Sequence, residues 1–477
     1  MPRLLRRDPP TGVGRDGPGQ GVASDSQRRF KPARRTELGL IVFGCLLVVA
    51  AYVLATVGTT AKIPGNLGIF LAIVLGLALV AHVATRRYAP DASPVMLPLV
   101  VLLNGLGYVM VASIDAHYAK LQAAWTAAGV VFYVLALVVV KRSRDLDRYR
   151  YLLLLAGAAL LLAPLVPHVG EDINGARLWV HVGPINGQPV EVAKIFLCIF
   201  FASYFVEKRE MLSVPTMRLG NRLVIDPRPA GPIIVAWLFA MVILGGENDI
   251  GFTLMIFVLF VLMLWIATGR LAWLVVGLIM FAVGAFVASH LFAQVNYRVE
   301  DWLDPWSKQN YDRPLGSFQI VQSQYSFGNG GLLGTGLGYG FWGSPPLFTT
   351  GELATDYIFI VFGQEMGLIG TSVIVAAFLL VVGAGLQIAQ RARTEFSSLA
   401  ATGLTAILGV QAFIIMAGLV RLLPLTGITL PFMAYGGSSL VANYIIVAFL
   451  MRISDEGNRS IITAAATATR VQAAAIN

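Results

Sequence analysis

Long uninterrupted apolar stretches are the feature that most constrains how this chain can fold. Hydrophobic residues make up 57% of the sequence, charged residues only 13%, and the mean hydropathy is +0.73. Soluble proteins carry about 25% charged residues, so this composition indicates a protein that resides in a lipid bilayer. At about 1.5 Å of rise per residue, these stretches can cross a hydrocarbon core about 30 Å thick as helices. The alternation of polar and apolar residues that a membrane β-barrel requires is not visible.

These stretches predict an all-α polytopic membrane protein with about twelve transmembrane helices. The seventh predicted span is short and is separated from the eighth by the polar sequence GGENDIG, and the twelfth begins with AYGGSS, which is unlike a lipid-facing sequence. In chain order, the predicted spans are residues 38–58, 67–85, 95–113, 121–140, 151–166, 189–206, 231–245, 250–268, 271–292, 357–387, 399–420 and 433–451. An even number of spans places both ends of the chain on one side of the membrane.

The distribution of Lys and Arg predicts that both termini are cytoplasmic. With the N-terminus inside, 27 of the 35 Lys and Arg residues fall in cytoplasmic segments, as the positive-inside rule requires. This asymmetry accounts for most of the net charge of +9, so nucleic-acid binding is not supported. Residues 1–37 are basic, rich in Pro, Gly and Ser, and lack apolar periodicity, which predicts a disordered cytoplasmic tail. Residues 454–477 are expected to form a second cytoplasmic tail.

One outer loop, residues 293–356, is far longer than a connection between two helices needs. It contains too many aromatic residues for a disordered linker. We therefore expect it to pack onto the outer ends of the helices, with short amphipathic helices at the level of the lipid headgroups. Its aromatic residues include Trp302, Trp306, Tyr311, Phe318, Tyr325, Phe327 and Trp342.

Ionisable side chains gather towards the same outer side. Glu191 and Lys194 lie at membrane depth and are three residues apart on one helix, so their spacing allows an ion pair. A structural pair that orients the helix and a ligand-binding role are equally compatible with this spacing. Further charged residues near the outer face are Glu247, Asp249, Glu365 and Arg421. Together they indicate a polar cavity that opens outward beneath the long loop.

Two glycine motifs look like nucleotide- or anion-binding sequences but lack the usual context. GTGLGYG, residues 334–340, follows no strand of a βαβ unit and lies on the wrong side of the membrane for a nucleotide. Its glycines suit tight turns or close approach to a lipid-linked pyrophosphate. YGGSS, residues 435–439, suits either a turn or an anion held by backbone amides. Cys45 and Cys198 are expected to be buried hydrophobes, and the five histidines lack ligand spacing, so no metal site is predicted.

An outward polar cavity suits a transporter, a channel or an enzyme that acts on a lipid-linked substrate. A transporter is expected to show internal repeats and polar residues at the midplane, and the polar groups here gather at one face instead. An enzyme with no metal motif, Ser–His pair or nucleotide loop must use carboxylates and cations. A carboxylate can act as general base toward a sugar hydroxyl, while Arg and Lys stabilise a departing pyrophosphate. This combination favours glycosyl transfer from a polyprenyl-pyrophosphate sugar.

Six ordered motifs resemble the SEDS family of bacterial peptidoglycan glycosyltransferases. They are GARLWVHVGPINGQPVEVAKIFL, DIGFTL, YRVEDWLDPW, FQIVQSQYSFGNGGLLGTGLGYG, TDYIFIVFGQEMGLIG and PLTGITLPFMAYGGSSLVANY. The elongation-type RodA branch is the more similar, and the division-type FtsW branch is next. The resemblance implies a core of ten transmembrane helices over residues 95–453. Residues 38–94 are then two extra N-terminal transmembrane helices, as in actinobacterial RodA-like proteins.

The resemblance also implies a function and an essential carboxylate. The function is polymerisation of lipid II on the outer face of the bacterial plasma membrane, for cell elongation and shape. A class B penicillin-binding protein is the expected partner and supplies transpeptidation. The family's essential carboxylate falls on Asp312, with Asp304 as the reserve. About four extra residues separate these two positions, and Arg313 replaces the family's usual Pro.

The resemblance assigns further roles around this base, which would take the proton of the acceptor sugar's 4-hydroxyl group. Arg177 and Lys194 are expected to hold phosphate or to position the base, with Glu191 orienting Lys194. Gln188 and Ser438 are additional substrate-binding candidates. No cofactor is certain, although a divalent cation (Mg²⁺ or Mn²⁺) could bridge the pyrophosphate to a carboxylate. The alternatives are a lipid II flippase, a division-type FtsW-like polymerase, and a scaffold that activates the penicillin-binding partner.

Overall fold

The computed structural model describes residues 33–62, 67–173, 176–182, 185–213, 217–219, 222–224, 249–313, 316–340 and 349–476. The predicted seventh span, residues 231–245, lies outside the described residues, as do residues 1–32 of the predicted N-terminal tail, Glu247 and Trp342.

Long apolar helices dominate the described part of the chain, which confirms the predicted all-α polytopic fold. Nine of them are long and apolar enough to cross a membrane. They are α2 (Ala33–Thr60), α3 (Leu67–Tyr88), α4 (Met96–Ile114), α5 (Ala116–Val139), α11 (Ile250–Thr268), α12 (Ala272–Leu291), α17 (Ile358–Gln390), α18 (Glu395–Leu419) and α19 (Gly437–Ile476). The shorter α7 (Arg150–Leu162) and the charge-bearing α8 (Val190–Glu207) match two further predicted spans.

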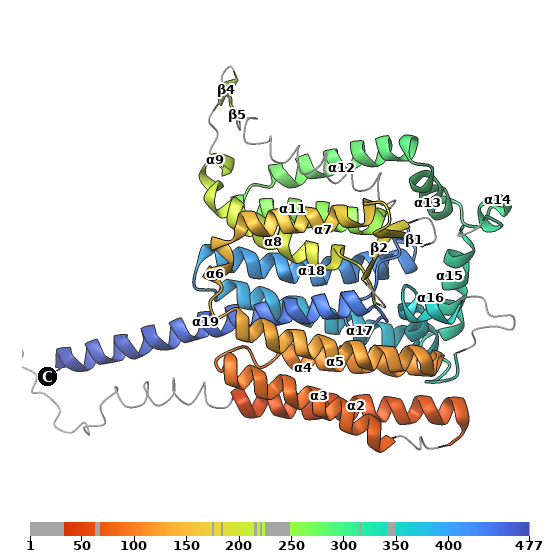
Figure 1. The fold of residues 1–477 in the computed structure, drawn as a ribbon, viewed down its shortest axis with the longest axis horizontal. Coiled ribbons are helices and arrows are strands. Elements are labelled where there is room, and N and C mark those ends of the chain that lie inside the picture. The colour runs from red at the N-terminus through yellow and green to blue at the C-terminus, as the bar shows by residue number, and fades with distance from the viewer. Residues whose placement is uncertain are drawn as a thin grey trace, which may run out of the picture.

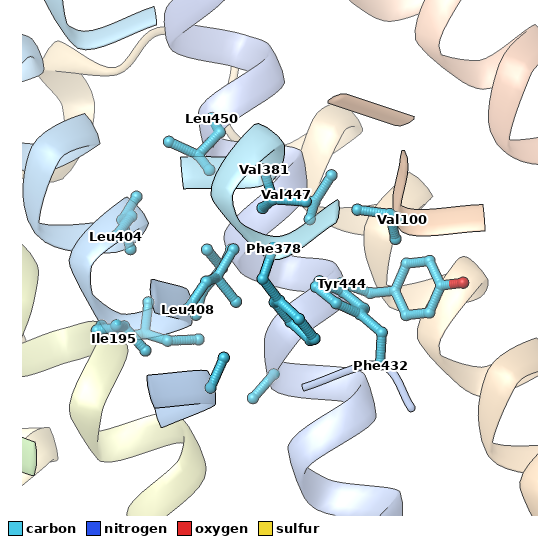
Figure 2. Close-up of a cluster of buried hydrophobic side chains, with 14 of the residues drawn as sticks. Val100, Ile195, Phe378, Val381, Leu404, Leu408, Phe432, Tyr444, Val447 and Leu450 are labelled. Atoms are coloured by element: carbon cyan, nitrogen blue, oxygen red, sulfur yellow. The ribbon is translucent and has the colours of Figure 1, made fainter. Parts of the chain in front are cut away.

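The long helices run side by side in one bundle (Figure 1). α2 and α3 lie along one edge, α12 lies along the opposite edge, and α8, α18 and α19 lie between them. The core forms where α17, α18 and α19 meet α4 and α8, and its side chains include Phe378, Leu404 and Val447 (Figure 2). Phe43 on α2 and Phe286 on α12 are exposed, as expected for helices that face lipid rather than water.

The first spanning helix begins a few residues before the predicted span, residues 38–58. α2 already begins at Ala33. Glu37 is completely buried, and its carboxylate pairs with Arg86 and lies 2.7 Å from His82 Nδ1 on α3. Because these contacts need Glu37 inside the helix pair, the helix starts before the apolar stretch that the sequence pattern detects.

The last helix likewise continues beyond the predicted span, residues 433–451. α19 runs without a break from Gly437 to Ile476 and projects beyond the bundle (Figure 1). Glu456 accepts hydrogen bonds from Ser143 N and Oγ at 2.7 and 2.6 Å, and Asp455 accepts one from Asp91 N at 2.8 Å. The helix therefore continues because its polar turn binds the loops that follow α3 and α5.

The connections contain short elements that the sequence did not predict individually. The outer loop holds α13 (Ala293–Leu303), α14 (Lys308–Tyr311), α15 (Phe318–Gly330) and α16 (Thr350–Ala354). An antiparallel sheet, in the order β1 (Gly170–Ile173), β2 (Ala176–Val182), β3 (Ile185–Gly187), precedes α8. The remaining elements are α6 (Arg144–Arg148), the 3₁₀ turn η1 (Ala163–Leu165), α9 (Arg209–Ser213) and the hairpin of β4 (Met217–Leu219) and β5 (Arg222–Val224).

The residues that directly follow α15 pair with a break in α17. Gly367 has φ 63° and ψ −164°, a conformation that is open essentially to glycine alone. The backbone N–H groups of Leu368 and Ile369 donate to Gly331 O and Leu332 O at 2.9 and 3.2 Å. A polar break in a spanning helix is tolerated when protein groups replace the lost hydrogen bonds, and here the outer loop supplies them. Within GTGLGYG itself, Gly334, Gly336 and Gly338 have φ values of 83°, 103° and 78°, and a Cβ on Gly334 would lie 2.2 Å from Glu365 O. These glycines therefore form turns and allow close backbone contact.

Candidate outward-facing site

The ion pair predicted on α8 is confirmed. Glu191 and Lys194 are both completely buried and their side chains contact each other. Lys194 Nζ also donates to Gln411 Oε1 on α18 at 2.7 Å, and Gln411 Nε2 donates to Thr429 O at 2.9 Å. The pair therefore ties α8 to α18 and to the chain that leads into α19.

Two more predicted residues meet beside the start of α8. The backbone N–H of Gln188 donates to Ser438 Oγ at 3.0 Å. This contact joins the segment between β3 and α8 to the first turn of α19, 250 residues away in the sequence. Arg177 lies on β2 and is exposed.

Three charged residues gather at the outer helix ends. Asp249 is only 5% exposed and caps α11 by accepting from Gly251 N at 2.9 Å. Asp356 precedes α17, and Arg298 lies on α13. Burial raises the pKa of Asp249 to about 6 and the pKa of Asp356 to about 7, while the Arg298 guanidinium opposes both shifts. These two carboxyl groups can exchange protons near neutral pH.

Sequence reasoning missed Arg298 and Asp356 as members of this site. In the sequence, both are isolated charged residues in predicted outer segments. Asp356 offered one signal, because it lies directly before an apolar span, as Asp249 does. Arg298 offered none, because its proximity to both carboxylates depends on how α13 returns over the bundle.

A hydrogen-bonded chain fixes α15 over the outer helix ends. Gln319 Nε2 on α15 donates to Glu352 Oε1 at 3.0 Å, and the Tyr357 hydroxyl donates to Gln319 Oε1 at 2.6 Å. Glu352 belongs to α16 and forms a capping box with Thr349. The loop is therefore held to the start of α17 by satisfied polar contacts.

The other end of the loop is clamped as well. Trp302 Nε1 donates to Arg421 O at 3.1 Å, while Arg421 Nε and Nη2 donate to Trp302 O and Leu303 O at 3.0 and 2.9 Å. Arg421 follows α18, so this contact fixes α13 to the bundle. The expectation that the long loop packs onto the helices is confirmed.

The two candidate carboxylates, Asp304 and Asp312, are exposed at the ends of α13 and α14. Asn310 is buried and its Nδ2 donates to Asp304 O at 2.8 Å. Arg313 Nη2 donates to Glu300 Oε2 at 2.8 Å, and its guanidinium lies 4.2 Å from the centre of the Tyr297 ring. The extra residues between Asp304 and Asp312 thus form α14, and Arg313, which replaces the usual Pro, anchors it to α13.

The structure does not gather every predicted residue in one place. It joins Glu191 with Lys194 and Gln188 with Ser438. Asp312 directly follows α14 as its C-cap residue. α14 lies at the edge of the molecule, away from α8 (Figure 1). The physical reason is the anchoring of Arg313, which holds α14 against α13 rather than over the buried ion pair.

Fold and site together define a polytopic membrane protein with polar side chains gathered beneath the structured loop of residues 293–356. In the described residues, no group of three or more His, Cys, Asp or Glu side chains could hold a metal ion. Residues 92–459 match the model of the cell cycle protein family that includes FtsW, RodA and SpoVE. The chain belongs to this family.

Individual relatives agree with the family match. The chain is 38% identical to a peptidoglycan glycosyltransferase RodA of Mycobacterium tuberculosis, over 91% of this chain and 93% of the relative. It is 32% identical to a probable peptidoglycan glycosyltransferase FtsW of Geobacter sulfurreducens, over 76% of this chain and 94% of the relative. A solved chain from a peptidoglycan synthase complex has the same fold, with a TM-score of 0.59, 24% identity, and coverage of 75% of this chain and 96% of that chain.

Proposed function

We propose that this protein is a peptidoglycan glycosyltransferase that polymerises lipid II on the outer face of the bacterial plasma membrane, in cell elongation and shape. The observation that carries the proposal is the 38% identity to a RodA glycosyltransferase over nearly the full length of both chains. The polar groups beneath the outer loop support it, because the sugar headgroup of a lipid-linked substrate lies at that level.

In the proposed reaction, the 4-hydroxyl oxygen of the acceptor sugar attacks the anomeric carbon of the donor. The bond from that carbon to the pyrophosphate oxygen breaks with inversion, and polyprenyl pyrophosphate leaves. Asp312 takes the hydroxyl proton as general base, with Asp304 in reserve. Asp356 is a further candidate for the base, because its pKa, raised to about 7, matches the value at which a general base works best.

Cationic and polar side chains complete the proposed site. Arg177 and Lys194 stabilise the departing pyrophosphate, with Glu191 orienting Lys194. Gln188 and Ser438 position the substrate, and their mutual hydrogen bond of 3.0 Å supports a shared role. A divalent cation, Mg²⁺ or Mn²⁺, fits this chemistry only if pyrophosphate oxygens supply most of its ligands, as Mg²⁺ sites often require.

The proposed enzyme crosses the plasma membrane several times, and both of its termini are cytoplasmic. The partner is a class B penicillin-binding protein. The solved peptidoglycan synthase complex coordinates polymerization and crosslinking, which supports the same division of labour here. An elongation role is favoured over a division role, because the identity to the RodA relative exceeds that to the FtsW relative.

The test is polymerisation of lipid II by the purified protein in detergent, with and without the penicillin-binding partner. We expect glycan strands that a muramidase digests. A lipid II flippase would form no polymer in detergent, where there is no second compartment. Absence of polymer in both samples, with folded protein and bound partner, would overturn the proposed function.

A further inference from the structure

The outer end of α2 touches the glycine motif, residues 334–340, backbone to backbone. A Cβ atom on Gly58 would lie 2.2 Å from Leu337 O. On the opposite side of the contact, Gly338 has a φ of +78°, and a Cβ there would lie 2.2 Å from Ala55 O. Real Cβ atoms do not approach backbone oxygens this closely, so the contact exists only because both positions are glycine.

A side chain from the glycine motif reinforces this contact. Leu337 packs against a small apolar cluster that α2, α3 and α4 share. The buried members of the cluster are Val48, Tyr52, Ala55, Phe70 and Val109. Most of this docking site comes from α2 and α3, which precede residue 92, where the family model begins.

The same glycine motif is bound to α17 on its other side. Thr335 N and Gly336 N donate to Gln364 O and Glu365 O at 2.9 and 3.0 Å, and Gly338 N donates to Glu365 Oε2 at 2.9 Å. Its upstream neighbour is α15, which carries the Gln319 contacts to α16 and α17. A continuous set of contacts therefore connects α2 to the helices that cover the outward site.

We propose that α2 is a positioning element for the outer loop, acting through Gly58 and the Leu337 docking site. The inference rests on the proposed function, because its main effect is on the rate of glycan polymerisation. The helix pair α2–α3 has its own cluster for Leu337, so it sets where the glycine motif and α15 lie relative to α17. Gly58 and Leu337 act through the loop and do not touch the substrate.

Two matched pairs of variants of the full-length protein test this proposal. Gly58→Ala is compared with Gly39→Ala on the same helix, where an added Cβ meets nothing within 4 Å. Leu337→Ala is compared with Leu333→Ala, because Leu333 is 75% exposed. We expect Gly58→Ala and Leu337→Ala to lower kcat for lipid II by about 10- to 100-fold with KM nearly unchanged. A displacement of the catalytic groups by about 1 Å can reduce the rate by a factor of this size. Both controls keep the wild-type kcat.

Hydrogen exchange of residues 331–340 supplies a readout that does not depend on activity. Faster exchange in Gly58→Ala and Leu337→Ala, but not in the controls, is expected. Equal kcat and exchange in the test and control variants would overturn the positioning role, and so would a kcat loss that only follows the loss of folded protein. An inactive wild type would instead overturn the proposed function, and the exchange data would still decide whether α2 holds the loop.

Discussion

At the scale of single residues, the buried ion pair offers the sharpest test of the two roles that its spacing allows. Lys194→Met leaves the Glu191 carboxylate without its partner at a completely buried position. Breaking one side of a buried pair destabilises a protein by about 3–5 kcal/mol. We expect a loss of that size in the free energy of unfolding, measured in detergent, and partial recovery in the double variant Glu191→Gln with Lys194→Met. Unchanged stability would show that Lys194 is solvated and available to a ligand.

The Asp356 carboxyl group predicts a pH dependence. Burial raises its pKa from 3.8 to about 7 in the folded protein. Between these values the folded state holds a proton that the unfolded state has released, so the free energy of unfolding falls as pH rises from about 4 to about 7. Asp356→Asn should flatten this slope in denaturant midpoints measured across that range. The same slope in the variant and the wild type would refute the assignment.

Local spacing explains which site residues were predictable. Glu191 and Lys194 are three apart on one helix, so their contact follows from helix geometry. Gln411, which completes their hydrogen-bond network, lies 217 residues from Lys194. The grouping of Arg298 with Asp249 and Asp356 is equally non-local. Such contacts depend on helix packing, which apolar patterning does not specify.

At the scale of elements, the break in α17 gives a prediction with an internal control. Gly367 has a positive φ, and an added Cβ would lie 2.4 Å from Gly334 N. Gly383 lies in the same helix, and its Cβ would meet nothing within 4 Å. We expect Gly367→Ala to lower the free energy of unfolding by about 1–3 kcal/mol or more. Gly383→Ala should be neutral or stabilising by up to about 1 kcal/mol. Equal unfolding temperatures in Gly367→Ala and Gly383→Ala would contradict the claim that the backbone at Gly367 requires glycine.

Long elements were predictable and short ones were not. Each described spanning helix overlaps a predicted span, because about 20 apolar residues in a row have few alternatives in a bilayer. The strands β1 and β3 contain only four and three residues, too few for a pattern to emerge. α14 is a single turn, and it is held by the contacts that Asn310 and Arg313 make with α13 and Asp304 rather than by a repeated sequence pattern.

At the scale of the whole molecule, the polar contacts gather at the two ends of the bundle. At one end, Arg452 and Glu456 on α19 bind backbone groups at the end of α3 and directly after α5. At the other end, the outer loop binds α17, α18 and the extra helix α2. An apolar bundle lies between these two polar layers, which is the arrangement that a bilayer requires.

The same arrangement underlies the proposed activity. The proposed site lies beneath a loop that is fixed at α13 by Arg421, at α15 by Gln319 and at its glycine motif by α2 and α17. A fixed loop suits a catalyst, because a general base must remain in reach of the proton that it removes. The identity of that base is therefore central to the proposed mechanism.

The most direct measurement is the rate of lipid II polymerisation by the purified protein with its proposed penicillin-binding partner, for the wild type, Asp312→Asn, Asp304→Asn and Asp356→Asn. We predict that Asp312→Asn alone loses about 10²- to 10⁴-fold in rate, while remaining folded and bound to the partner. A wild-type rate in Asp312→Asn, with a loss in Asp304→Asn or Asp356→Asn, would move the base to that residue. Wild-type rates in all three variants would contradict carboxylate catalysis of glycan polymerisation by this protein.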